Sequence, residues 1–318
     1  MPEPGSGEVQ IKIHAVSLNR RDELLVRGAY GPTPTPFVAV SDGAGEIAGL
    51  GADVAGWSIG DRVTPHYYPS WNDGPPAPNQ GWGLGSPGQD GVLSEYVVLP
   101  ASRLSLAPQT LSFEEAACLP CAGLTAWTAL NGNRPYTRQI GPEDRVLVVG
   151  TGGVSLLALL IAKAAGAEVV ATTRSPLKIE KVKQLGAYGT LDMNGSSNWG
   201  EIAAERFGGF TRVVNAAGSA ALDQSILALA SGGEIALMGL FEHASTSPDF
   251  IQLMMRGGAI RGISVGSAMA FQDLVAFVDK HRIQPPIAET FAFDDARAAY
   301  RSAAGSDHIG KVVIRVAS

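Results

Sequence analysis

Residues 145–175 read RVLVVGTGGVSLLALLIAKAAGAEVVATTRS, and this stretch decides the fold of the chain. An apolar strand at 145–150 leads into a glycine-rich turn, an apolar helix follows at 153–165, and a second apolar strand spans 168–173. A Gly-x-Gly turn alone is also found in ordinary strand-to-helix connections. The complete strand–turn–helix–strand unit is typical of dinucleotide binding, which we therefore expect here.

The residues of this turn suit a pyrophosphate group. Gly150 permits a tight turn, Gly152 lets the backbone approach the phosphates, and the free N–H groups at the helix start would face them. The full fingerprint has a third glycine where this chain has Ser155, which is small enough for close packing of helix on strand. The predicted cofactor-binding residues of the turn are Gly150, Thr151, Gly152, Gly153 and Val154.

The end of the second strand indicates which cofactor is bound. NAD sites place an acid about 20 residues after the turn, where it binds the ribose hydroxyls. This chain has Thr173 and Arg174 there, with Lys178 one turn later. Both cations would attract a 2′-phosphate, so we predict NADPH, held in part by these three residues. In the alternative interpretation, Arg174 and Lys178 are simply the solvated start of a helix.

The alternation of strands and helices continues to residue 266. The strands are continuous apolar runs, as in parallel strands that are buried on both faces. Six strands with helical crossovers predict an α/β fold with a doubly wound, parallel, six-stranded sheet. After the first two, the strands are expected at 189–193, 212–218, 233–239 and 259–266, and the helices at 176–185, 199–207, 219–230 and 248–256.

The flanking regions follow a different pattern. Residues 7–60 are β-rich, and the segment 69–91 has eleven Gly or Pro in twenty-three residues, which predicts a long loop. A helix is expected from Ser112, the N-cap, with Glu115 at capping-box spacing. A helix at 267–282, a strand at 287–293, a helix at 294–304 and a strand at 310–316 should close the chain. We predict a nucleotide-binding domain at 120–266, inserted between 1–119 and 267–318.

Composition and charge exclude several classes of protein. The chain has 318 residues, 45% of them hydrophobic, and a net charge of −6, without a long basic run. Nucleic acid and anionic membrane surfaces are therefore not expected as partners. The polar N-terminus does not resemble a signal peptide, and no apolar run is long enough to span a membrane. Cys118 and Cys121 are the two cysteines, which suits a reducing, cytoplasmic location.

The stretch LNRRD, residues 18–22, follows a strand-like run of apolar residues. Asn19 can be interpreted in two ways, as the cap of a turn before a helix at 20–28 or as part of the wall of a reaction site. Arg20, Arg21 and Asp22 are expected to be solvated.

The chain resembles the zinc-free quinone-oxidoreductase-like and alcohol-dehydrogenase-like members of the medium-chain dehydrogenase/reductase superfamily over essentially its whole length. The resemblance implies a GroES-like catalytic domain, a Rossmann domain, a hydride-transfer cleft between them, and a homodimer formed through 259–266. Members of the family usually begin with one or two further strands before the segment that corresponds to PEPGSGEV, residues 2–9, and this chain starts at that segment. The matching pieces are LNRRD, SDGAGEIAGLGADV, GDRV, EEAACLPCAGLTAW, GTGGVS, KQLGA, RGISVG and GKVVI.

The same resemblance bears on zinc. Members that use a catalytic zinc ion hold it with Cys, His and Cys, and these positions correspond to Asn19, Asp42 and Cys121 here. The cysteine-rich lobe that holds a structural zinc ion would fall in 69–91, which contains no cysteine. We therefore expect no zinc. Cys118 and Cys121 form a C-x-x-C at helical spacing without a second ligand pair, so core or cleft-wall positions are expected.

Without a metal, another group must polarise the substrate. Conjugated enones, enoyl thioesters and quinones are easier to reduce in this way than bare ketones, and a nearby donor would act as general acid. The resemblance implies Asn19 and Tyr30 as catalytic residues. Tyr30 could instead be an aromatic residue packed under the following loop.

The remaining site residues are carried over from the family or from the ends of strands. A substrate pocket is expected to include Asp42, His66, Tyr67 and Trp71, although Asp42 could equally be a turn acid and the aromatic residues could supply shape alone. Further cofactor contacts are expected at Thr125, Asn215, Gly239, Val265 and Ser267.

Three functions remain open on these grounds. The first is a zinc-independent, NADPH-dependent reductase of an activated C=C bond or a quinone. The second is a metal-free carbonyl or alcohol oxidoreductase. The third is a nucleotide-binding protein with a non-redox or accessory biosynthetic role.

Overall fold

The computed structural model describes residues 1–318 apart from 30–35, 79, 137, 240–247, 306–307 and 317–318. The described residues form two compact units, one of Met1–Leu124 with Val265–Ser318 and one of Thr125–Ser264. The second unit is thus inserted in sequence into the first. Its limits lie a few residues from those expected from the sequence.

The unit Thr125–Ser264 contains a parallel, six-stranded sheet, so the predicted fold class is confirmed. The strand order reverses at β6, which has β7 on one side and β9 on the other. Open α/β sheets bind ligands beside the carboxyl ends of their strands at such a reversal. In spatial order the strands are β11 (Ala259–Gly262), β10 (Leu229–Leu237), β9 (Phe210–Asn215), β6 (Arg145–Val149), β7 (Glu168–Thr173) and β8 (Gly189–Asp192).

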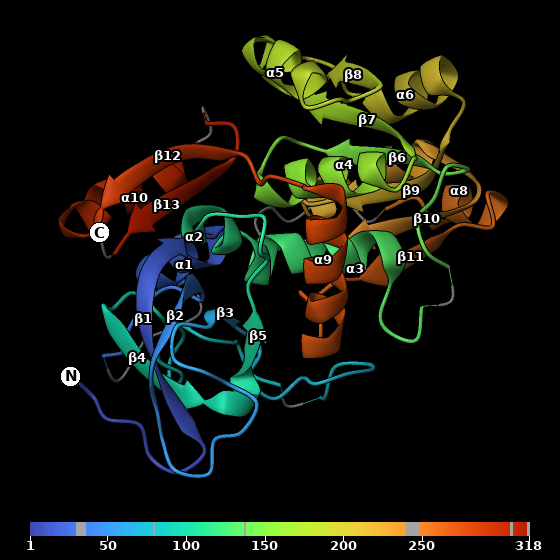
Figure 1. Cartoon of the computed structure of the whole chain (residues 1–318). Coiled ribbons are helices and arrows are strands. Elements are labelled where there is room, and N and C mark those ends of the chain that lie inside the picture. Colours follow the sequence, from blue (N-terminus) through green and yellow to red (C-terminus); the bar gives the residue numbers. More distant parts are fainter. Residues whose placement is uncertain (30–35, 79, 137, 240–247, 306–307, 317–318) are drawn as a thin grey trace. The chain divides into compact units, whose positions relative to one another are not determined.

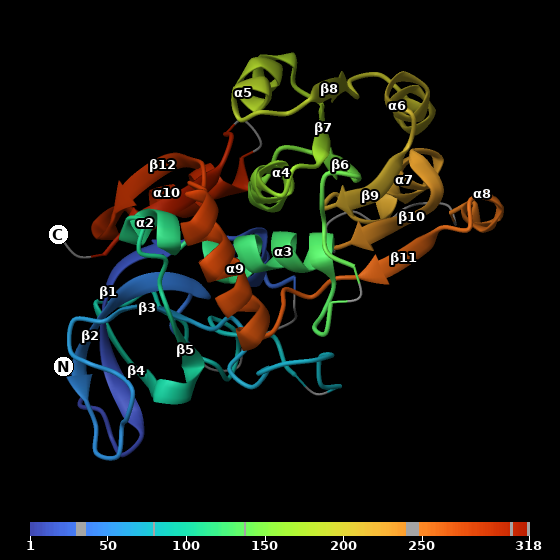
Figure 2. The same cartoon turned by 45° about the vertical axis from the view of Figure 1, so that its right-hand side comes forward.

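Helices cover both faces of this sheet. Figure 2 shows α4 and α5 on one face and α6, α7 and α8 on the other. The apolar side of α4 is fully buried at Leu156, Leu157 and Ile161, as expected for a crossover helix in a doubly wound fold. The helices are α3 (Leu124–Asn131), α4 (Gly153–Ala164), α5 (Ile179–Gln184), α6 (Trp199–Phe207), α7 (Leu222–Leu227) and α8 (Phe250–Met255).

The first unit is built on a mostly antiparallel sheet of seven strands in the part of the chain that the structure describes. Val9, Ile11 and Ile13 of β1 are fully buried in alternation, as the sequence predicted. β1 is an interior strand, because it pairs with β2 on one side and with β4 and β13 on the other. The strands are β12 (Ile287–Ala292), β13 (Lys311–Arg315), β1 (Glu8–Ser17), β2 (Asp42–Leu50), β3 (Arg62–Pro65) and β5 (Leu104–Leu106), with β4 (Tyr96–Pro100) on β1.

The predicted helix from Ser112 begins as expected but is interrupted. Ser112 N donates to Glu115 Oε2 at 2.9 Å, and Glu115 N donates to Ser112 Oγ at 3.2 Å, which confirms the capping box. The helix is then broken by a π-helical turn, Leu119–Gly123, because Pro120 cannot donate a helical hydrogen bond. Figure 1 shows the other helices of this unit, including α10 against β12 and β13. The α-helices are α1 (Arg20–Val26), α2 (Phe113–Ala116), α9 (Ala268–His281) and α10 (Ala296–Ala304).

Short 3-10 turns complete the two units, at Ala101–Arg103, Pro176–Lys178, Ser219–Ala221 and Phe293–Asp295. Among the described residues, no helix has both the length and the apolar character needed to cross a membrane.

Candidate functional site

Asn19 lies between β1 and α1 and contacts a buried lysine from the other end of the sequence. Lys311, the first residue of β13, donates from Nζ to Asn19 Oδ1 at 2.5 Å and to Leu18 O at 2.5 Å. Because an ammonium group only donates, it fixes the oxygen of the amide toward Lys311 and turns the NH₂ group away. Asn19 Nδ2 lies 3.4 Å from Ser41 Oγ, a long contact. Asn19 as a residue is partly exposed.

Asp42, the first residue of β2, is a fully buried acid. Its Oδ1 accepts from Ser41 Oγ at 2.7 Å, and its Oδ2 accepts from Cys121 N at 2.9 Å. Burial raises the pKa of Asp42, while the ammonium of Lys311 opposes that shift. Asp42 therefore connects β2 to the π-helical turn, and in this structure it is not among the residues that line the pocket described below.

The expectation that Arg20, Arg21 and Asp22 are solvated is wrong for two of the three. The Arg20 side chain is 44% exposed and pairs with Glu23, but the Arg21 side chain is only 10% exposed and Asp22 is 2% exposed. Successive residues on a helix point to different faces, so three adjacent charges need not share an environment. Asp22 Oδ2 accepts from Asn19 N at 2.8 Å, and burial raises its pKa to about 6.

The three positions that correspond to zinc ligands fit a zinc ion poorly. The oxygen of Asn19 faces the Lys311 ammonium, and both oxygens of Asp42 accept hydrogen bonds. Burial raises the pKa of the Cys121 thiol, which opposes formation of the thiolate that zinc requires. Burial also raises the pKa of Cys118 to about 11. Among the described residues, no group of three or more His, Cys, Asp or Glu is arranged to hold a metal ion.

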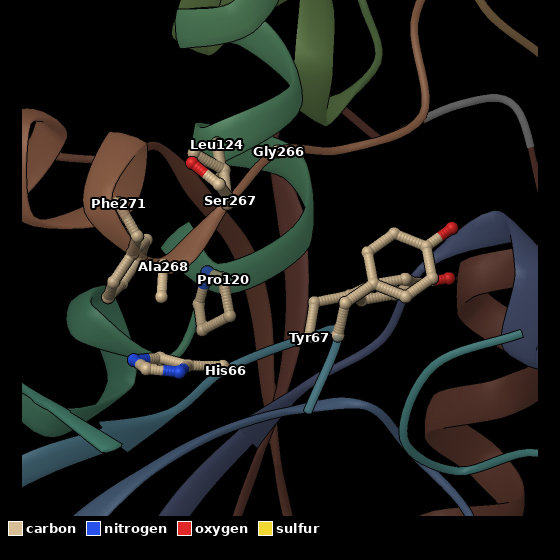
Figure 3. Close-up of a pocket in the computed structure, with 9 residues that line it drawn as sticks. His66, Tyr67, Pro120, Leu124, Gly266, Ser267, Ala268 and Phe271 are labelled. Atoms are coloured by element: carbon tan, nitrogen blue, oxygen red, sulfur yellow. The ribbon is translucent and has the colours of Figure 1, made fainter. Parts of the chain in front are cut away.

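A small pocket, partly open to solvent, lies within the first unit. His66 and Tyr67, two of the residues predicted for a substrate pocket, line it, and Figure 3 shows them extending to opposite sides of Pro120. His66 Nε2 lies 2.8 Å from Ser105 Oγ, and burial lowers the pKa of His66 to about 4, so it is neutral at pH 7. Burial raises the pKa of Tyr67 well above its usual value, so the phenol stays protonated. The other lining residues are Tyr68, Pro120, Leu124, Gly266, Ser267, Ala268 and Phe271.

Trp71 and Ser267 meet at the N-terminus of α9. Trp71 O accepts from Ala268 N at 2.8 Å, and Ser267 Oγ accepts from Ala270 N at 3.2 Å. Both residues therefore satisfy N–H groups that a helix start leaves without intrahelical partners. Trp71 is not among the pocket-lining residues, whereas Ser267 is. Val265 has a φ of 58°, an unusual conformation for a β-branched residue and one that is often found near functional sites.

The glycine-rich turn has the predicted conformation. Gly150 has a φ of 90°, which an L side chain rarely adopts, and Gly152 is the N-cap residue of α4. A Cβ atom added at either glycine would meet no atom within 4 Å, so the backbone is open to a ligand. Gly153 and Val154 form the first turn of α4. Thr151 lies between the two glycines, and Ser155 anchors the helix because its Oγ donates to Val149 O at 3.0 Å.

The end of β7 carries Thr173 and Arg174. Thr173 is buried, and its Oγ1 accepts from Ser175 N at 3.1 Å, which shapes the turn. Arg174 is exposed, whereas Lys178 is only 9% exposed. Of the two predicted phosphate ligands, Arg174 is therefore the more accessible.

Thr125 and Asn215 are both buried in the second unit. Asn215 ends β9, and its Oδ1 accepts from Ala217 N and Gly218 N at 3.0 and 3.1 Å, so the side chain organises the following turn. Gly239 follows β10 with a φ of 92°. Tyr30, the other predicted catalytic residue, lies outside the described residues.

Sequence reasoning missed Lys311 and the burial of Arg21. In the sequence, Lys311 stands out only as part of GKVVI, and a charge at the start of an apolar strand is usually exposed at the strand end. What distinguishes it is its partner, Asn19, which is far away in sequence, so the pairing becomes visible only when β13 lies beside β1.

Comparisons with known proteins agree with this architecture. Residues 5–109 match the alcohol dehydrogenase GroES-like domain, and residues 153–280 match the zinc-binding dehydrogenase family. The chain is 40% identical to a zinc-type alcohol dehydrogenase-like protein of Schizosaccharomyces pombe, over 98% of this chain and 91% of the relative. It is 29% identical to an acryloyl-coenzyme A reductase of Metallosphaera sedula, over 98% of this chain and 93% of the relative. The solved structure of an NAD-dependent alcohol dehydrogenase matches with a TM-score of 0.88 and 31% identity, over 100% of this chain and 94% of that structure's chain.

Proposed function

Because this chain belongs to the medium-chain dehydrogenase/reductase superfamily of oxidoreductases, we propose that it is a zinc-independent reductase of an activated C=C bond or a quinone, and that it uses NADPH. The observation that carries this proposal is the Lys311–Asn19 contact. It turns the NH₂ group of Asn19, a partly exposed residue, away from the lysine. The N–H would serve as the electrophilic group, at a position that corresponds to a metal ligand in zinc-dependent members of the family.

The chemistry follows from where charge develops. Bound NADPH would supply a hydride to the β-carbon of an enone or enoyl substrate, and negative charge would then develop on the carbonyl oxygen. Asn19 Nδ2–H can donate to that oxygen, and a donor aimed at a developing oxyanion is among the largest catalytic effects known. The Lys311 ammonium on Asn19 Oδ1 polarises the amide and strengthens its N–H as a donor. A proton from solvent completes the saturated product.

The proposal that the cofactor is NADPH rests on the positive charge at the end of β7. Arg174 is exposed there, and no acid stands at the position that binds ribose hydroxyls in NAD enzymes. One relative is named as NAD-dependent, so comparison of the kcat/KM values for NADPH and NADH is the necessary test. A higher value for NADH would overturn this part of the proposal.

A metal-free carbonyl or alcohol oxidoreductase is the second candidate. One relative is named an alcohol dehydrogenase, and another is named alcohol dehydrogenase-like.

An activity assay distinguishes the candidates. Purified protein should be assayed by NADPH oxidation with methyl vinyl ketone, benzoquinone and acetone as separate substrates. Turnover of the first two only would support the proposal, and turnover of acetone would favour the second candidate. Binding of NADPH without turnover would favour a non-redox or accessory role. Stoichiometric zinc in the active protein would overturn the metal-free part.

We also propose that the chain forms a homodimer through β11 and α8. β11 pairs only with β10 among the described strands, and an edge strand offers unpaired N–H and C=O groups. α8, just before β11, exposes Ile251, Met254 and Met255 at 66%, 69% and 75%. Such apolar exposure is typical of an interaction surface. Light scattering should show a dimer that Met254→Glu converts to a monomer, and a wild-type monomer would refute this assembly.

A further inference from the structure

Arg21 is the charged residue of LNRRD that the proposed chemistry does not use, and it is largely buried. Its Nη1 donates to Leu84 O at 2.6 Å, and its Nη2 donates to Trp82 O at 3.1 Å. Asp22 Oδ1 lies 3.7 Å from Nη1 and supplies a counter-charge. A planar guanidinium can hold two carbonyl groups at once, which an ammonium cannot do with the same geometry.

The same guanidinium covers an aromatic wall of the pocket. Arg21 Cζ lies 5.1 Å from the centroid of the Tyr67 ring, within the range of a cation–π interaction. Tyr67 Oη donates to Trp82 O at 3.3 Å, and Leu84 N donates to Tyr67 O at 3.0 Å. Arg21, Tyr67 and the segment 82–84 therefore hold one another in place.

Gly83 completes this arrangement from the loop side. It has a φ of 78°, and a Cβ atom there would lie 2.6 Å from Tyr67 Cε1 and 2.8 Å from Tyr67 O. Only a residue without a side chain can pack this closely on the tyrosine. Gly81 has a similar φ of 76°, but a Cβ atom there would meet no atom within 4 Å.

We infer that Arg21 is a positioning residue that fixes Tyr67 as a wall of the substrate pocket and thereby sets the size of substrate that the pocket accepts. This inference rests on the proposed function for its substrate, but the contacts between Arg21 and the loop do not depend on it. The long loop 69–91 contains no helix or strand among its described residues, so its path depends on contacts with neighbouring segments, and the hydrogen bonds from Arg21 are among them.

The test compares Arg21→Met with Arg20→Met, its exposed neighbour, and Gly83→Ala with Gly81→Ala. For Arg21→Met and Gly83→Ala we expect hydrogen exchange at the Leu84 amide to become about tenfold faster or more, the scale expected when hydrogen bonds to a charged group are lost. The ratio of kcat/KM for methyl vinyl ketone to that for benzylideneacetone should change by about tenfold, mainly through KM. The two control variants should lie much closer to the wild type in both measurements, and Gly81→Ala controls for the strain of alanine at a positive φ, which it shares with Gly83→Ala.

Unchanged exchange at Leu84 in Arg21→Met would overturn the inference. Faster exchange with unchanged KM values for both ketones would support the contact of Arg21 with the loop, but it would refute the pocket as the substrate site, which belongs to the proposed function. If Arg21→Met fails to fold, Gly83→Ala carries the test, because it displaces Tyr67 while Arg21 is intact. Arg21→Lys, which keeps the charge, should recover only part of the wild-type selectivity.

Discussion

Lys311 Nζ lies 2.5 Å from Asn19 Oδ1, although the two residues are at opposite ends of the sequence. The contact exists because β13 pairs with the carboxyl-terminal end of β1, just before Asn19. It fixes the orientation of the amide and places a buried positive charge behind it. If Asn19 donates to the substrate oxygen, the two residues should act as one unit.

Asn19→Ala removes the donor, and we expect kcat to fall about 10²-fold, as is typical when one oxyanion donor is lost. Lys311→Met should lower kcat by a smaller factor, and the double variant should be no worse than Asn19→Ala alone, because Lys311 acts through the amide. NADPH affinity should change little. Steady-state kinetics and fluorescence titration of NADPH check these outcomes.

Lys280→Met serves as the control for this pair, since Lys280 is an exposed lysine on α9. Lys311→Arg should be more active than Lys311→Met, because a guanidinium can also donate to Asn19 Oδ1. Additive losses in the double variant would show that Lys311 does not work through Asn19.

Local patterns predicted the elements well. Continuous apolar runs marked β6 and β7, alternation marked β1, and the capping residues Ser112 and Glu115 marked the start of α2. These features depend on residues close in sequence, whose effect on the backbone is direct.

The environment of individual charges could not be predicted in this way. Whether Arg21 or Arg20 is buried depends on where the loop 82–84 passes, and that loop has no periodic signal. The π-helical turn at Pro120 likewise places Cys121 N on Asp42, a contact between segments far apart in the sequence. The sequence made Asn19 a candidate site residue, but it did not reveal the buried cation that contacts its amide oxygen.

Asp22 should make stability depend on pH. Burial raises its folded-state pKa to about 6, above the ordinary value of 3.8, so the folded state binds the proton more tightly than the unfolded chain. This contribution is fully present below about pH 4 and is lost as the pH rises through about 6. Asp22→Asn keeps an oxygen that can accept from Asn19 N and does not ionise. The free energy of unfolding of Asp22→Asn minus that of the wild type should therefore increase between pH 4 and pH 7, by up to about 3 kcal/mol.

Urea unfolding at several pH values measures this difference. Glu201→Gln, which removes an exposed acid from α6, controls for the change in net charge. A difference between Asp22→Asn and wild type that does not vary with pH would contradict the raised pKa.

Arg174 should determine the choice of cofactor. Its guanidinium is exposed at the end of β7, and loss of a charged hydrogen bond to a phosphate costs about 1.5–3 kcal/mol. Arg174→Ala should therefore raise KM for NADPH by roughly tenfold to a hundredfold and leave KM for NADH nearly unchanged. Lys181→Ala, an exposed lysine on α5, is the control. Equal losses with both cofactors would indicate that Arg174 does not contact the 2′-phosphate.

The two glycines of the β6–α4 turn allow cofactor binding to be separated from stability. Gly152 has a φ of −78° and Gly150 a φ of 90°, yet an added Cβ atom would meet no protein atom within 4 Å at either position. Gly152→Ala should lower the Tm only slightly, because alanine is a poorer N-cap residue than glycine. It should raise Kd for NADPH by about tenfold or more, because the new methyl group would occupy space needed by the pyrophosphate. Gly150→Ala should also lower the free energy of unfolding, by about 1 kcal/mol, because alanine is strained at positive φ. Thermal melts and NADPH titrations of both variants provide the comparison. If Gly152→Ala bound NADPH as tightly as the wild type, the phosphates would not lie against this turn.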